Sequence, residues 1–158
     1  MAKDVLEGKR ILIVDDEPDV IETLKNLLSM CSLVEAYTFE DARDFFERES
    51  FDLAILDIMG VDGYKLLEIA KDKDVPAIML TANALSVSHT VRSFKEGAAF
   101  YVPKEEMVHI ERYLKDILVA LRKGKKLRNR WLERMGSFYE KKFGPDWQHD
   151  DEEFWGNF

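Results

Sequence analysis

Acidic, hydroxyl and basic side chains stand directly after apolar runs of this sequence, where they could do chemistry together. Asp15 and Asp16 follow one such run, Asp57 closes another, and Thr81 and Lys104 come after two more. Grouped carboxylates repel one another, and a hard divalent cation with oxygen ligands, such as Mg²⁺, relieves that repulsion. An aspartate can also attack phosphorus to form an acyl phosphate, whose oxygens a lysine and a hydroxyl would stabilise. We therefore interpret the five residues as a phosphoryl acceptor site.

Each of these residues has a more ordinary interpretation when it is taken alone. Asp15 and Asp16 would favour the start of a helix, and Thr81 would cap one. Lys104 would be a surface charge, and Tyr101 would be a strand residue of the core. The acceptor interpretation therefore depends on the elements that would bring these residues together.

Five short apolar runs alternate with segments of helical periodicity along the chain. We expect strands at 11–14, 33–37, 51–57, 76–80 and 98–102. Helices are expected at 18–30, after Thr38 as a cap, at 64–70, at 86–96 and from 105 to 121, the last with Leu121 on its buried stripe. This alternation predicts an α/β fold, a doubly wound five-stranded parallel sheet with five helices, followed by a C-terminal helical tail. Because the carboxyl ends of parallel strands open at one edge, the dispersed polar residues would form one site there.

The composition limits the broad class of protein. The chain has 158 residues, 46% of them hydrophobic, a formal net charge of −8 and one cysteine, Cys31. The acidic balance argues against a general nucleic-acid binder, and a single cysteine provides neither an internal disulfide nor a metal-ligand set. The first residues lack the apolar core of a signal peptide, and no apolar run approaches the roughly 18 residues of a membrane span. We expect a cytoplasmic protein without a membrane span.

The last part of the chain, residues 123–158, has a pattern of its own. Seven basic residues lie between Arg122 and Arg134 against one acid, and apolar residues recur at helical spacing until Gly144. An acidic and aromatic end follows, and this segment holds all three tryptophans. We expect the apolar stripe to pack back on the rest of the chain or on a second copy in a homodimer. A helix that docks a partner protein, or a basic run that touches nucleic acid or an anionic membrane, is the alternative. No helix-turn-helix pattern, and so no DNA-binding domain, is recognised.

A set of residues in the right order, each at the end of a strand, resembles the receiver domain of two-component response regulators: Asp15-Asp16, Asp57, Thr81-Ala82, Tyr101 and Lys104. The resemblance implies a flavodoxin-like fold of the single-domain, chemotaxis-regulator type. It covers residues 9–122, with an N-terminal arm at 1–8 and the amphipathic basic helix and acidic aromatic tail at 123–158.

The resemblance also implies a role for each matching residue. Asp57 would be the phosphoacceptor, and Thr81 and Lys104 would contact the phosphoryl oxygens. Asp15, Asp16 and Asp57 would hold Mg²⁺ together with the backbone carbonyl of Met59. Tyr101 would be an aromatic switch residue that follows the movement of Thr81.

The implied function is that of a stand-alone signalling protein. It would take its phosphoryl group from a histidine kinase or a phosphotransfer protein and signal by a conformational change to an unknown downstream protein partner. Met59 and Asn83 would gate water and so set the lifetime of the phosphoryl group. A shortened loop after Asp57 motivates the alternative of a phosphorylation-independent interaction module. We expect no enzyme with a separate substrate, because Met59 stands where an aspartate-based phosphatase commonly has a second acid.

Overall fold

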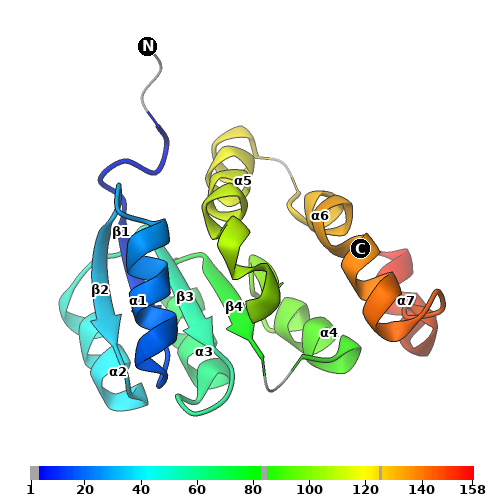
Figure 1. Ribbon diagram of the computed structural model, residues 1–158, viewed down its shortest axis with the longest axis horizontal. Coiled ribbons are helices and arrows are strands. Elements are labelled where there is room, and N and C mark those ends of the chain that lie inside the picture. Colours follow the sequence, from blue (N-terminus) through cyan, green and yellow to red (C-terminus); the bar gives the residue numbers. More distant parts are fainter. Residues whose placement is uncertain (1–3, 83–84, 125) are drawn as a thin grey trace.

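The computed structural model describes residues 4–82, 85–124 and 126–158 and shows an α/β sandwich with a helical extension (Figure 1). Its strands are β1 (Arg10–Val14), β2 (Ser32–Ala36), β3 (Leu53–Asp57), β4 (Ala77–Thr81) and β5 (Phe100–Pro103). Its α-helices are α1 (Pro18–Leu27), α2 (Phe39–Arg48), α3 (Gly63–Asp72), α4 (Val87–Lys95), α5 (Ile110–Lys123), α6 (Arg128–Phe143) and α7 (Glu152–Gly156). Two 3₁₀ helices, η1 (Lys104–His109) and η2 (His149–Asp151), precede α5 and α7.

The sheet confirms the predicted doubly wound topology. All five strands are parallel, in the order β2-β1-β3-β4-β5. Every residue of β3 and β4 is buried, which explains why these strands read as continuous apolar runs without a polar face. The central position of β3 places Asp57 in the middle of the carboxyl edge.

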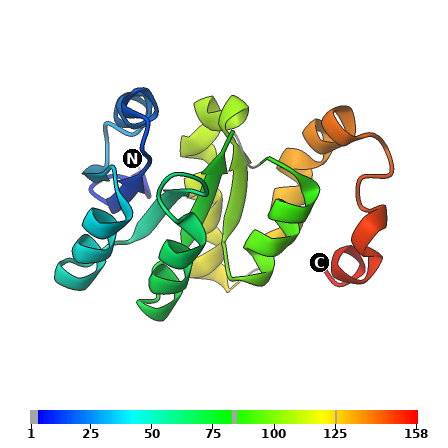
Figure 2. The same ribbon diagram turned by 90° about the horizontal axis from the view of Figure 1, so that it is seen from below.

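Helices cover both faces of the sheet, and the extension lies at one end of it. Seen from below, α1 and α5 lie on one face, and α2, α3 and α4 lie on the other (Figure 2). The extension, α6 with α7, lies beyond α4 at the end of the sheet formed by β5 (Figure 2).

Local signals in the sequence explain several helix ends. Thr38 caps α2 by accepting a hydrogen bond from the backbone N–H of Asp41, as predicted. Ser86 does the same for α4, accepting from the N–H of His89 at 3.0 Å. Gly97 follows α4 with a φ of +101°, a left-handed conformation that favours glycine.

The prediction for the fifth helix is wrong in two respects. The chain forms the 3₁₀ helix η1 first, so the α-helix begins at Ile110 instead of 105. Leu121 was expected on the buried stripe of this helix but is 56% exposed. It lies in the last turn before Gly124, which ends α5 with a φ of +66°.

The segment before β1 and the C-terminal extension also pack on this core. Leu6, in the predicted N-terminal arm, is fully buried, and its carbonyl oxygen accepts a hydrogen bond from the half-buried thiol of Cys31. The predicted amphipathic helix is confirmed as α6, which ends at Gly144. The acidic end folds into η2 and α7, which the sequence pattern had not indicated. No helix in the described ranges is both long and apolar enough to cross a membrane.

Candidate functional site

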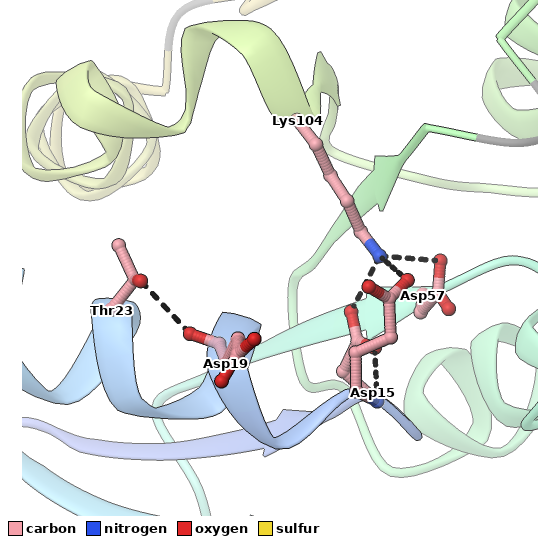
Figure 3. A network of polar contacts seen from close by, with 6 residues as sticks. Asp15, Asp19, Thr23, Asp57 and Lys104 are labelled. Carbon is pink, nitrogen blue, oxygen red and sulfur yellow. Dashed lines mark hydrogen bonds and ion pairs between the residues drawn. The ribbon is translucent and has the colours of Figure 1, made fainter.

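The structure brings the predicted polar residues to the carboxyl edge of the sheet. Asp15 directly follows β1, Asp57 and Thr81 end β3 and β4, and Lys104 follows β5. Figure 3 shows the Lys104 side chain extending toward the carboxylates of Asp15 and Asp57. Asp15, Asp57 and Thr81 are buried although they are polar.

Lys104 is the cationic centre of the site. Its Nζ atom lies 3.0 Å from Asp15 Oδ2, 3.1 Å from Glu17 Oε1 and 3.8 Å from Asp57 Oδ1. Only 11% of its side chain is exposed, so water screens these ion pairs weakly. Glu17 is a partner of Lys104 that the sequence interpretation missed. Its place directly after Asp15-Asp16 was the available signal.

The carboxylates of the site carry unfavourable charge. The pKa of Asp57 is raised from 3.8 to about 7, chiefly by burial and next by the nearby charge of Asp15, while Lys104 opposes the rise. Burial also raises the pKa of Asp15, against hydrogen bonding from the Glu17 N–H and from Lys104. The site therefore has more negative charge than Lys104 alone offsets.

The loop after Asp57 packs so closely against Asp16 and against its own backbone that two positions need glycine. A Cβ at Gly60 would lie 2.7 Å from Asp16 Cγ, and Gly60 also has a φ of +83°. A Cβ at Gly63 would lie 2.7 Å from Ile58 Cα. Met59, directly before Gly60, is 51% exposed.

The donor set fits a divalent cation. Asp15, Asp16 and Glu17 can each direct one carboxylate oxygen to a common point, with these atoms within 4.8 Å of one another. Asp15 Oδ2 is buried and, within the described ranges, accepts no hydrogen bond beyond its ion pair with Lys104. A hard cation with oxygen ligands would satisfy this atom. The described cluster contains Asp15 and Asp16, as predicted, and adds Glu17.

The remaining predicted residues fall into two groups. Thr81 and Tyr101 are fully buried, on β4 and β5. Asn83, predicted to gate water with Met59, lies outside the described residues. His89, which is half-buried, has its Nδ1 2.8 Å from the hydroxyl of Tyr64, and its ring stacks on that residue.

Comparisons with known proteins identify one family over most of the chain. The family described as the response regulator receiver domain matches residues 11–115. A probable transcriptional regulator, ycf27, from Guillardia theta is 42% identical over 106 residues, or 64% of this chain and 41% of the relative. Response regulator GtcR from Aneurinibacillus migulanus is 42% identical over 80 residues, 48% of this chain and 33% of the relative.

A solved structure agrees with this family. A CheY-like response regulator receiver domain protein from Methanospirillum hungatei has a TM-score of 0.60 and 29% identity, over 70% of this chain and 95% of that protein. The curated relatives are longer, since the chain spans about two-fifths of the length of the Guillardia theta protein. The matched part includes all the residues of the carboxyl edge described above.

Proposed function

Because the chain belongs to the response regulator receiver family of two-component systems, we propose that Asp57 accepts a phosphoryl group from a histidine kinase or phosphotransfer protein. One observation carries the proposal. Asp57 ends the central strand, is 5% exposed, and lies 3.8 Å from the Lys104 ammonium. A buried carboxylate beside a fixed cation suits a nucleophile whose product carries more negative charge.

The proposed reaction transfers the phosphoryl group from a phosphohistidine. One Asp57 carboxylate oxygen attacks phosphorus, and the O–P bond forms as the P–N bond breaks. The electron pair of the broken bond goes to the imidazole nitrogen, which takes a proton from water. Only the ionised form of Asp57 can attack, and Lys104 favours that form because it lowers the pKa of Asp57. Thr81, fully buried at the end of β4, would donate its hydroxyl to a phosphoryl oxygen.

Mg²⁺ is the proposed cofactor. Asp15, Asp16 and Asp57, with the Met59 carbonyl, would hold the ion, and Glu17 would add a nearby carboxylate. When bound, it would offset the negative charge of the carboxylates and of the transferred oxygens. The chemistry would be limited to phosphorylation and dephosphorylation of Asp57 itself, with the signal passed to a downstream protein.

Intact-protein mass spectrometry tests the proposal. Wild type, Asp57→Asn and Asp62→Asn are each incubated with acetyl phosphate and Mg²⁺. Asp62 is exposed and has a left-handed φ of 52°, a conformation that asparagine tolerates, so Asp62→Asn controls for the chemical change. We expect one phosphoryl adduct in wild type and in Asp62→Asn and none in Asp57→Asn.

Two outcomes contradict this proposal. A stoichiometric adduct on Asp57→Asn would show that another residue is the acceptor. A wild type that takes up neither a phosphoryl group nor beryllofluoride, a mimic of an acyl phosphate, would favour the phosphorylation-independent interaction module.

A further inference from the structure

The C-terminal extension, residues 126–158, docks on the end of the sheet through a buried aromatic surface. Trp131, Met135 and Tyr139 of α6 are fully buried. The Trp131 ring lies 5.2 Å from the ring of Phe94 in α4 and stacks on Trp155 of α7 at 5.9 Å. The apolar stripe of α6 therefore forms the centre of the docking surface, and Arg134 adds an ion pair with Asp116 of α5 at 3.0 Å.

Two buried aromatic side chains of α6 make hydrogen bonds to the receiver part. Trp131 Nε1 donates to the carbonyl oxygen of Tyr101 at 2.8 Å. Because β5 is an edge strand, this carbonyl has no further strand to pair with, and the indole supplies a donor. The Tyr139 hydroxyl lies 2.5 Å from Thr90 Oγ1. Since Thr90 donates its own hydrogen to the carbonyl oxygen of Ser86, Tyr139 is the donor in this bond.

The same two contacts lie beside the residues that lead to the acceptor. In the register of β4 and β5, Met79 pairs with Tyr101 and Thr81 pairs with Pro103. Because side chains alternate along a strand, Tyr101 and Thr81 lie on one face of the sheet as diagonal neighbours. Burial raises the pKa of Tyr101, whereas hydrogen bonding to Thr90 lowers it, so the two hydroxyls are in contact.

A continuous set of buried groups therefore runs from the extension to the carboxyl edge. Its members, from α6 inward, are Tyr139, Thr90, Tyr101 and Thr81. Asp57 ends the neighbouring strand, where it pairs with Leu80, and Lys104, directly after β5, lies 3.8 Å from its carboxylate. The four members and Asp57 are buried. In an interior packed this closely, one member cannot move without a change in the position of the next.

We propose that Tyr139 and Trp131 are positioning residues for the acceptor site, so that docking of the extension and occupancy of Asp57 favour each other. This inference rests on the proposed function of Asp57. Docked α6 holds Tyr101 and Thr90 in their buried positions, and so removes part of the ordering that a ligand at Asp57 would otherwise impose. By linkage, a ligand at Asp57 strengthens the docking by the same factor.

The test measures beryllofluoride binding, with Mg²⁺, by titration calorimetry of the full chain. Tyr139→Phe keeps the packing and removes one hydrogen bond, and Trp131→Phe removes the indole donor. Tyr113→Phe is the matched control, because Tyr113 is buried and stacks on Phe100 on the opposite face of β5. We expect about 3- to 10-fold weaker binding in the two extension variants, the range of one lost hydrogen bond, and less than a twofold change in the control.

A second measurement uses wild type alone, so its result does not depend on whether the variants fold. All three tryptophans lie in the extension, at 131, 147 and 155, so intrinsic fluorescence reports its packing. We expect beryllofluoride to change the fluorescence and to slow hydrogen exchange of the α6 amides. If wild type binds beryllofluoride, but exchange in α6 is unchanged and Tyr139→Phe binds equally or more tightly, the coupling is refuted while the acceptor stands.

A protein in which Asp57 is not an acceptor would give a different set of results. If wild type binds no beryllofluoride, the proposed function fails, and hydrogen exchange of the unliganded proteins decides the coupling. Faster exchange at Thr81 and at residues 86–90 in Tyr139→Phe, but not in Tyr113→Phe, would support positioning by the extension. Equal exchange in the two variants would overturn it.

Discussion

Replacing Asp57 by asparagine should stabilise the protein at high pH and leave its stability nearly unchanged at low pH. The pKa of Asp57 is raised from 3.8 to about 7 in the folded protein, chiefly by burial. A carboxyl group with a raised pKa binds more protons in the folded than in the unfolded state, so its ionisation costs stability as the pH rises. The loss of stability from ionising Asp57 is small near pH 4, grows up to about pH 7 and is constant at higher pH.

The size of this loss of stability follows from the change in the pKa of Asp57. A rise from 3.8 to about 7, at about 1.4 kcal/mol per pKa unit, corresponds to about 4 kcal/mol. The favourable effect of Lys104 is already included in that pKa. Asparagine has nearly the same shape and no charge, so it avoids the cost. We therefore expect Asp57→Asn to be more stable by about 2–4 kcal/mol at pH 8, which raises Tm by about 5–15 °C for a chain of this length.

Thermal unfolding of wild type and Asp57→Asn, from pH 4 to pH 8.5 in EDTA, measures the effect. Asp146→Asn, at an exposed carboxylate of the extension, is the control and should follow wild type. Adding Mg²⁺ at pH 8 should raise the Tm of wild type more than that of Asp57→Asn, because the cation offsets the charge that asparagine lacks. Parallel pH profiles for wild type and Asp57→Asn, or a variant that is less stable at pH 8, would refute the electrostatic reasoning.

Two further substitutions test other parts of the site. Lys104→Met should move the pH-dependent loss of stability above pH 7, because Lys104 lowers the pKa of Asp57, and should slow phosphorylation by acetyl phosphate roughly 100-fold. Thermal unfolding against pH measures the first effect, and a mass-spectrometric time course measures the second. Phosphorylation at the wild-type rate would exclude a role of Lys104 in the transfer. Gly63→Ala should destabilise the protein by about 3 kcal/mol, since its Cβ would overlap the backbone after Asp57. Urea unfolding measures this, with Gly136→Ala as the control. Gly136 lies within α6 with nothing within 4 Å of a Cβ, so alanine there should stabilise by up to about 1 kcal/mol.

The sequence predicted the sheet and its carboxyl edge because parallel topology leaves few choices. Once five apolar runs alternate with helices, right-handed crossovers bring every strand end to one edge. Asp15, Asp57, Thr81 and Lys104 could therefore be grouped without any knowledge of distances. The roles assigned to them, and the division of the chain at residue 122, stay predictions.

The rest depended on tertiary contacts that periodicity does not specify. The apolar stripe of α6 predicted a buried face, but not that Trp131 would reach the edge carbonyl of Tyr101. The five-residue helix α7 is too short for a periodic signal. Its one local mark was Asp151, whose side chain caps the helix by accepting from the N–H of Phe154. Likewise, nothing near His89 in sequence indicated its contact with Tyr64.

Aromatic side chains of the receiver part and of the extension pack together, and this limits where the chain can be divided. Phe94 of the receiver part packs against both Trp131 and Phe158 of the extension, so neither side can leave without exposing apolar surface on the other. Unfolding should then be a single cooperative event for both parts. A protein truncated after residue 122 would keep all the residues of the acceptor site, but it would expose an apolar patch that promotes aggregation. The family match ends at residue 115, but this residue is not the boundary of a part that would be stable by itself.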